Sequence, residues 1–221
     1  MNAETDTVLQ LYGRSTAFNV QKVLWLLDEL ELGFEHHLVG GRHGGLDDPA
    51  FIALNPHGKV PVLKDGDISI WESHAILRYL AAQYGDSRFW PLSPAERSVH
   101  GRWMDWSQTT LQPDFMRLFW RFYRMPEHKR DTEEIQRARR ACERHYRLID
   151  AELEQRRYLA CDRFSLADIP AGTTLYRYQE MGLDTALPAR AAEWYANLCQ
   201  RPAFQNRVMT PFSELRGRES F

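Results

Sequence analysis

The fold of this chain is decided by residues 55–76, which read NPHGKVPVLKDGDISIWESHAI. Asp65-Gly66 lies between the apolar runs Val62-Leu63 and Ile68–Ile70. Both turn residues tolerate positive φ, so this pattern predicts a two-residue β-hairpin. Apolar residues then recur at helical spacing. The stretch is therefore expected to form two antiparallel strands followed by a helix that begins near Glu72-Ser73.

The start of that helix has the chemistry of a binding site. Ser73 presents a hydroxyl beside free backbone N–H groups and the positive end of a helix dipole, which together favour an anion. Glu72 adds a carboxylate suited to an ammonium group. The pair therefore fits the head of an α-amino acid, although a helix cap alone is the structural alternative.

Val60-Pro61 adds a second feature, because proline has no N–H to give to a sheet. If this peptide bond is cis, the backbone of Val60 turns outward and is free to pair with an extended peptide, as an edge strand does. A proline that merely opens a strand is the alternative. The close spacing of these features favours a binding site over separate structural roles.

Composition excludes several classes of protein. The 221 residues are 43% hydrophobic and 26% charged, with a net charge of −2, which gives no electrostatic field for nucleic acid or an anionic membrane. The three cysteines and eight histidines have no metal-site spacing, so no metal is expected. With no signal peptide or long apolar run, the sequence predicts a cytoplasmic protein without membrane or nucleic-acid partners.

The order of elements predicts two domains. The first half alternates strand, helix, strand, irregular helix, strand, strand and helix, which indicates parallel strands plus an antiparallel hairpin. Residues 89–94 are expected to be a linker, and almost everything after them is helical in pattern. A long aromatic segment over about 95–123 is expected to be interrupted near Pro113. Ser165 and Asp168 form a capping-box pattern at a later helix start.

These motifs resemble a known family. Asn-Pro-x-Gly-Lys-Val-Pro-x-Leu followed by Glu-Ser-x-Ala-Ile closely resembles the glutathione-binding half of cytosolic glutathione transferases. Ser-x-Ala-Asp resembles a helix start in the second half of that family, so the likeness covers nearly the whole chain. Tyr-Gly-Arg, Asn-Val-Gln-Lys-Val-Leu-Trp and Trp-Met-Asp-Trp look most similar to bacterial, theta-like members. The resemblance implies an α/β plus all-α protein, with a thioredoxin-like domain at 1–86 and an all-helical domain at 94–221.

The same resemblance implies the activity. A glutathione transferase conjugates the thiolate of its co-substrate, glutathione, to a small electrophile, here an apolar one, and detoxification is the expected role. Lys59, Val60, Glu72 and Ser73 are expected to hold glutathione, and the protein is expected to be a homodimer. A glutathione-dependent reductase, peroxidase or dehalogenase, or a non-catalytic ligand-binding relative, are alternative functions on the same fold.

The group that activates the thiol departs from the family pattern. The position that often carries an activating serine is Ala17 in this chain. Asn19, with Thr16 or Ser15, is the candidate replacement, because an asparagine amide offers two N–H donors without a titrating charge. A role for Thr16 or Asn19 in capping the helix is the alternative.

The second substrate is expected to lie against the aromatic helix. Phe115 and Phe119, spaced i and i+4, are the candidate lining pair, although most aromatic residues in this segment are expected to be core.

Overall fold

The computed structural model describes residues 8–219, and the chain divides between Tyr84 and Gly85 into two compact units. We call these unit 1 and unit 2. Residues 1–7, which the sequence assigns to the first domain, and 220–221, which it assigns to the second, lie outside the described residues. No helix among the described residues is long and apolar enough to cross a membrane.

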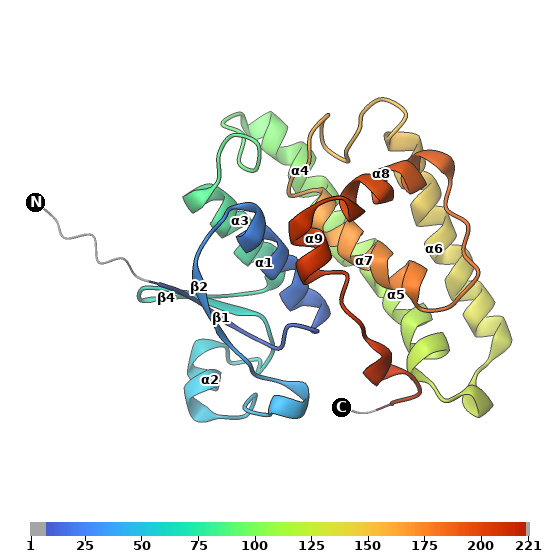
Figure 1. Ribbon diagram of the computed structural model, residues 1–221, viewed down its shortest axis with the longest axis horizontal. Helices are drawn as coiled ribbons and strands as arrows, with labels where there is room; N and C mark the ends of the chain where they lie inside the picture. The colour runs from blue at the N-terminus through green and yellow to red at the C-terminus, as the bar shows by residue number, and fades with distance from the viewer. Residues whose placement is uncertain (1–7, 220–221) are drawn as a thin grey trace, which may run out of the picture. The chain divides into compact units, whose positions relative to one another are not determined.

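Unit 1 is a small mixed sheet with helices on both sides (Figure 1). Its strand order is β2-β1-β3-β4, with β1 parallel to β2 and antiparallel pairing from β1 to β3 and from β3 to β4. In Figure 1, α1 and α3 pack together on one side and α2 lies on the other. The elements are β1 (Leu9–Tyr12), α1 (Phe18–Glu29), β2 (Phe34–His37), the 3-10 turn Gly41–His43, α2 (Pro49–Leu54), β3 (Val62–Asp65), β4 (Ile68–Trp71) and α3 (Ser73–Tyr84). This is the thioredoxin-like arrangement expected from the sequence.

The β3–β4 hairpin is present, but its turn lies one residue later than the sequence suggests. Asp65 pairs with Ile68, so Gly66 and Asp67 form the turn. Gly66 takes the positive φ of 55°, and glycine at the first turn position suits a tight hairpin. Asp65 belongs to β3 and not to the turn, and its carboxylate accepts hydrogen bonds from the hydroxyls of Tyr79 and Tyr84 on α3.

Unit 1 is held together by the burial of α1 against α3 and the sheet. The eight residues from Val20 to Leu27 are all buried, including Gln21 and Lys22. This exceeds the single apolar face that the pattern Val20, Val23, Leu24 and Leu27 predicts. The cause is that α1 is enclosed on more than one side, so that even a lysine on its surface is removed from water.

Unit 2 is helical, as expected. Figure 1 shows α7 surrounded by other helices of this unit, and every residue from Asp168 to Tyr178 is buried. The elements are α4 (Pro94–Trp106), the π-helical turn Ser107–Leu111, α5 (Gln112–Leu118), the π-helical turn Phe119–Arg124, the 3-10 turn Glu127–Lys129, α6 (Thr132–Glu152), α7 (Asp168–Glu180), α8 (Ala189–Cys199), α9 (Pro202–Arg207) and the 3-10 turn Ser213–Leu215.

Pro113 does not interrupt the aromatic segment, contrary to expectation. The chain remains helical from Pro94 to Arg124, and Pro113 lies in the first turn of α5. A π-helical turn directly precedes it. Such a turn shifts the backbone hydrogen bonds by one residue, and this is how a helix accommodates a residue that has no N–H to donate.

The capping-box pattern at the start of α7 is confirmed and extends further than the sequence implies. The carboxylate of Asp168 accepts hydrogen bonds from the main-chain N–H of Ser165 (2.9 Å) and of Leu159 (3.0 Å). It also accepts from the Ser165 hydroxyl (3.1 Å) and the indole N–H of Trp194 on α8 (3.0 Å). Burial raises the pKa of Asp168 to about 6, and the four donors oppose that shift. One buried carboxylate thus joins α7, α8 and the preceding loop.

Candidate functional site

A pocket of 240 Å³ lies in unit 1 and gathers the glutathione-binding residues expected from the sequence. They come from the segment before β3, from the start of α3 and from the first turn of α1. The lining residues are Asn19, Asn55, His57, Lys59, Val60, Pro61, Glu72 and Ser73. All four residues assigned to glutathione therefore share one hollow with Asn19.

The segment leading into β3 is braced by the buried side chain of Asn55. Its amide donates to the carbonyl of Lys59 (2.8 Å), and its carbonyl accepts the main-chain N–H of His57 (3.0 Å). The Val60-Pro61 peptide bond is cis. Among the described residues, no hydrogen bond involves the main-chain N–H or carbonyl of Val60. This short segment therefore offers both groups to a ligand backbone.

The start of α3 presents Glu72 and Ser73 to the same pocket. Glu72 is exposed and has a φ of 69°, a left-handed conformation that costs energy in a residue other than glycine. Strained residues of this kind concentrate at ligand sites. Ser73 is the first residue of α3 and only 3% exposed, so its hydroxyl lies beside the first main-chain N–H groups of the helix. A carboxylate fits this position.

The start of α1 contributes Asn19. Ala17 is the residue that precedes the helix, and its methyl side chain has no oxygen with which to cap the positive end of the α1 dipole. Asn19 is half-buried, and its Oδ1 accepts a hydrogen bond from Nζ of Lys22 (3.0 Å). Asn19 does not cap the helix, because it lies inside the first turn.

Lys22 and His74 form a buried pair next to Asn19. Lys22 is 1% exposed and His74 is 3% exposed, and Nζ of the lysine lies 3.3 Å from Nε2 of the histidine. Burial lowers the pKa of Lys22 to about 7, against an opposing effect of the Glu72 carboxylate. Burial, with the positive charges of Lys22 and Arg78, lowers the pKa of His74 to about 2. His74 is therefore neutral at any physiological pH.

The other candidate residues lie outside this pocket. Ser15 is exposed and Thr16 half-buried in the loop before α1, and neither lines the pocket. Phe115 and Phe119 are 0% and 2% exposed and pack together in unit 2, with ring centroids 5.6 Å apart. Phe119 also stacks on Tyr123. This burial favours the alternative of an aromatic core, and a substrate-lining role for the pair stays a prediction.

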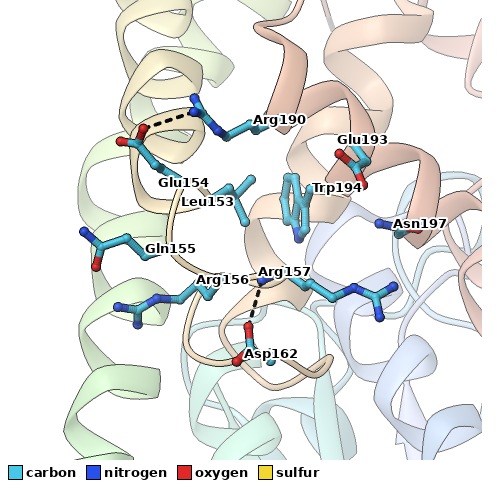
Figure 2. Close-up of a pocket in the computed structure, with 10 residues that line it drawn as sticks. All are labelled: Leu153, Glu154, Gln155, Arg156, Arg157, Asp162, Arg190, Glu193, Trp194 and Asn197. Atoms are coloured by element: carbon cyan, nitrogen blue, oxygen red, sulfur yellow. Dashed lines mark hydrogen bonds and ion pairs between the residues drawn. The ribbon is translucent and has the colours of Figure 1, made fainter.

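A larger hollow of 340 Å³ lies in unit 2, and Figure 2 shows that it is lined mainly by charged side chains. Two of the lining arginines are paired: Arg190 contacts Glu154 within the lining (3.1 Å), and Arg156 contacts Glu152 outside it (3.3 Å). Paired surface charges offer little to a ligand, so this hollow is a poorer candidate than the pocket of unit 1. Its lining is Leu153, Glu154, Gln155, Arg156, Arg157, Asp162, Arg190, Glu193, Trp194 and Asn197.

Comparison with known proteins identifies the family of the chain. Residues 11–88 match the family model of the glutathione S-transferase N-terminal domain, and residues 111–202 match that of the C-terminal domain. Glutathione S-transferase GstB of Escherichia coli strain K12 is 39% identical over 208 residues, covering 93% of this chain and 100% of the relative. The chain belongs to the glutathione S-transferase family. Glutathione S-transferase 3 of Zea mays, a more distant member, is 34% identical over 90% of this chain and 93% of its own length.

Among solved structures, this family member resembles the theta-class glutathione S-transferase of Xanthomonas axonopodis pv. citri with glutathione bound. The TM-score is 0.87, with 42% sequence identity over 93% of this chain and 99% of the other. The bacterial, theta-like resemblance seen in the sequence is thus confirmed.

Sequence reasoning missed two residues of the site region, Lys22 and His74. The signal for Lys22 was available: it stands three residues after Asn19, where side chains share a helix face, and it lies among apolar residues. His74 follows Ser73 and carried no signal of its own, since only the packing of α3 against α1 makes it the neighbour of Lys22.

Proposed function

We propose that this glutathione transferase binds glutathione in the pocket of unit 1, stabilises its thiolate and transfers the sulfur to a small apolar electrophile. The observation that carries the proposal is the convergence of three kinds of group in one hollow. These are an unpaired backbone segment at Val60, an ammonium-binding and anion-binding pair at Glu72 and Ser73, and an amide at Asn19.

Each part of glutathione has a matching group. The carboxylate of Glu72 suits the α-ammonium of the γ-glutamyl residue, and the hydroxyl of Ser73 with the start of α3 suits its α-carboxylate. The backbone of Val60 pairs with the cysteinyl backbone in the manner of an added strand. Lys59, which is exposed, reaches a carboxylate as a point charge.

Thiol activation needs little beyond what the first turn of α1 offers. A free thiol has a pKa of about 8.5, and lowering it by about two units requires roughly 2.7 kcal/mol of preferential thiolate stabilisation. One hydrogen bond from the Asn19 amide to a charged acceptor supplies about 1.5–3 kcal/mol. The dipole at the start of α1 adds about 0.3–1 kcal/mol. Thr16 or Ser15 is the candidate for a second donor.

Two features favour conjugation over a non-catalytic role and over mixed-disulfide chemistry. A donor stands in the pocket in spite of Ala17, which argues against a non-catalytic relative. All three cysteines, Cys142, Cys161 and Cys199, belong to unit 2, so the pocket offers no protein thiol for mixed-disulfide chemistry. A halide-release assay separates a dehalogenase from an aryl transferase on the same site.

The assignment is tested by calorimetric titration with glutathione, with Ser73→Ala as the variant. Loss of one charge-assisted hydrogen bond predicts an affinity lower by about 1.5–3 kcal/mol, or roughly 10- to 150-fold. Ser69→Ala, at an exposed serine of β4, is the matched control and should bind as the wild type does. No binding by the wild type, or equal binding by Ser73→Ala, would overturn the assignment.

We also propose a cytoplasmic homodimer, as the family resemblance implies. Sedimentation equilibrium at micromolar concentration should give twice the 25.9 kDa mass of the chain. A mass of one chain would contradict the proposal.

A further inference from the structure

Behind Asn19, the pocket of unit 1 has a polar layer that none of the assigned binding roles uses. It consists of Lys22 on α1 and His74 on α3, both almost completely buried. Burying a charged amine is unfavourable unless polar partners replace the hydration that it loses. Nζ of Lys22 lies 3.0 Å from Oδ1 of Asn19 and 3.3 Å from Nε2 of His74, so two polar groups stand where water has been removed.

We infer that Lys22 is a positioning residue for the thiol site: it holds the carbonyl end of the Asn19 side chain, so that the amide N–H donors are presented to the sulfur of glutathione. This inference rests on the proposed function of the pocket. Lys22 itself does not contact the sulfur in this arrangement and acts through Asn19.

The chemistry of the two groups fixes the direction of the amide. An ammonium group has three N–H donors and no acceptor, so it can bind only the oxygen end of the Asn19 side chain. With Oδ1 engaged by Lys22, the Nδ2 donors of Asn19 are directed away from the lysine. An asparagine without this partner could rotate by half a turn and present its oxygen to the sulfur, which would disfavour the thiolate.

His74 makes the arrangement robust to the protonation of Lys22. Its ring is neutral, so Nε2 can accept a hydrogen bond from the ammonium form of Lys22 or donate one to the amine form, according to its tautomer. In both states Lys22 retains an N–H for Oδ1 of Asn19. The charged groups acting on the pair are Glu72, which favours the ammonium form, and Arg78, which keeps His74 neutral.

The test compares the pKa of enzyme-bound glutathione thiol, followed by thiolate absorbance, in the wild type, Lys22→Met, Asn19→Ala and the double variant. Met has a similar length and no donor. Lys22→Met should raise the thiol pKa by about one unit, which means about tenfold less thiolate at low pH. Because Lys22 acts through Asn19, adding Lys22→Met to Asn19→Ala should change the thiol pKa no further. Lys22→Gln, whose amide can still donate, should restore part of the effect.

The controls separate this inference from the proposed function. Lys64→Met, at a half-buried lysine of β3, should leave the thiol pKa unchanged. S-methylglutathione should bind Lys22→Met as tightly as it binds the wild type, since recognition outside the sulfur is intact. If the wild type binds glutathione and Asn19→Ala raises its thiol pKa but Lys22→Met does not, the function stands and the inference is wrong. Additive effects in the double variant would also overturn it.

A measurement on the unmodified protein covers the case in which Lys22→Met does not fold. In asparagine-labelled protein, the side-chain amide protons of Asn19 should show nuclear Overhauser contacts to the cysteinyl methylene of bound glutathione. The resonances are assigned with Asn19→Asp, which keeps the acceptor for Lys22 and lacks the amide. Contacts from those protons to the terminal methylene of Lys22 instead would show the opposite orientation and overturn the inference.

Discussion

Replacing Asp168 by alanine should strongly destabilise unit 2, and the size of the loss follows from its hydrogen bonds. The carboxylate is 0% exposed and accepts from four donors, two of which, the Leu159 N–H and the Trp194 indole N–H, share one oxygen. Alanine leaves such donors buried without an acceptor, at about 1–3 kcal/mol for each. We therefore expect Asp168→Ala to lower the free energy of unfolding by about 3–5 kcal/mol, the range seen when one partner of a buried charged set is removed.

Two further variants calibrate this expectation. Asp168→Asn keeps one oxygen and turns the other acceptor into a donor that faces donors, so about 2 kcal/mol should be lost. Ser165→Ala removes only a hydroxyl and should cost about 1 kcal/mol, because the carboxylate retains its other partners. The expected order of destabilisation is Asp168→Ala, Asp168→Asn, Ser165→Ala.

The assay is urea unfolding followed by far-ultraviolet circular dichroism, whose helical signal comes mainly from unit 2. The free energy is taken from the transition of that unit, and the denaturant slope is compared among variants to exclude a change in the unfolded state. A loss below about 1 kcal/mol for Asp168→Ala, with an unchanged slope, would refute the view that this carboxylate joins α7 to α8.

Three other predictions concern unit 1. Stability should fall by up to about 1.4 kcal/mol per pH unit as the pH drops below 6.5, because the pKa of His74 is about 2 when folded and only the unfolded chain takes up the proton. Urea midpoints should show that slope in the wild type and not in His74→Leu; equal slopes would exclude His74 as the source. Lys59→Met should weaken glutathione binding and reduce the salt dependence of that binding in calorimetry. An unchanged salt dependence would show that Lys59 does not act on glutathione as a point charge. Tyr84→Phe should lower the free energy of unfolding in urea by at most about 1 kcal/mol, since Asp65 keeps its hydrogen bond to Tyr79. A larger loss would contradict the view that Tyr79 and Tyr84 both stabilise Asp65.

The fold was largely predictable because its signals are local. Alternation, turn residues and capping patterns all lie within a few residues of one another, and they indicated the hairpin, the start of α3 and the start of α7. The hairpin turn was misplaced by one residue because the sequence cannot show that Asp65 is held by tyrosines from α3. The π-helical turns around α5 carry no local signal, since they arise from how a long helix adjusts to proline and to packing.

The binding part of the site was predictable for a similar reason. Lys59, Val60, Glu72 and Ser73 come from one short stretch with a recognisable order. The spacing of Lys22 from Asn19 is visible in the sequence, but its burial is not, because a lysine on an amphipathic helix is expected to face water. Only the enclosure of α1 removes it from solvent, and that enclosure depends on α3, about fifty residues further along the chain.

The pocket of unit 1 takes its lining from two unconnected parts of the chain, the stretch from Asn55 to Ser73 and the first turn of α1. Mutations in one part need not disturb the other. An ancestral protein could therefore exchange residues 15–19 and acquire a different reaction at the sulfur, while its affinity for the tripeptide stayed as it was. The same separation is useful in the laboratory. A library randomised at the loop before α1 and selected for a new reaction should retain its co-substrate in most clones, so that selection acts on chemistry alone.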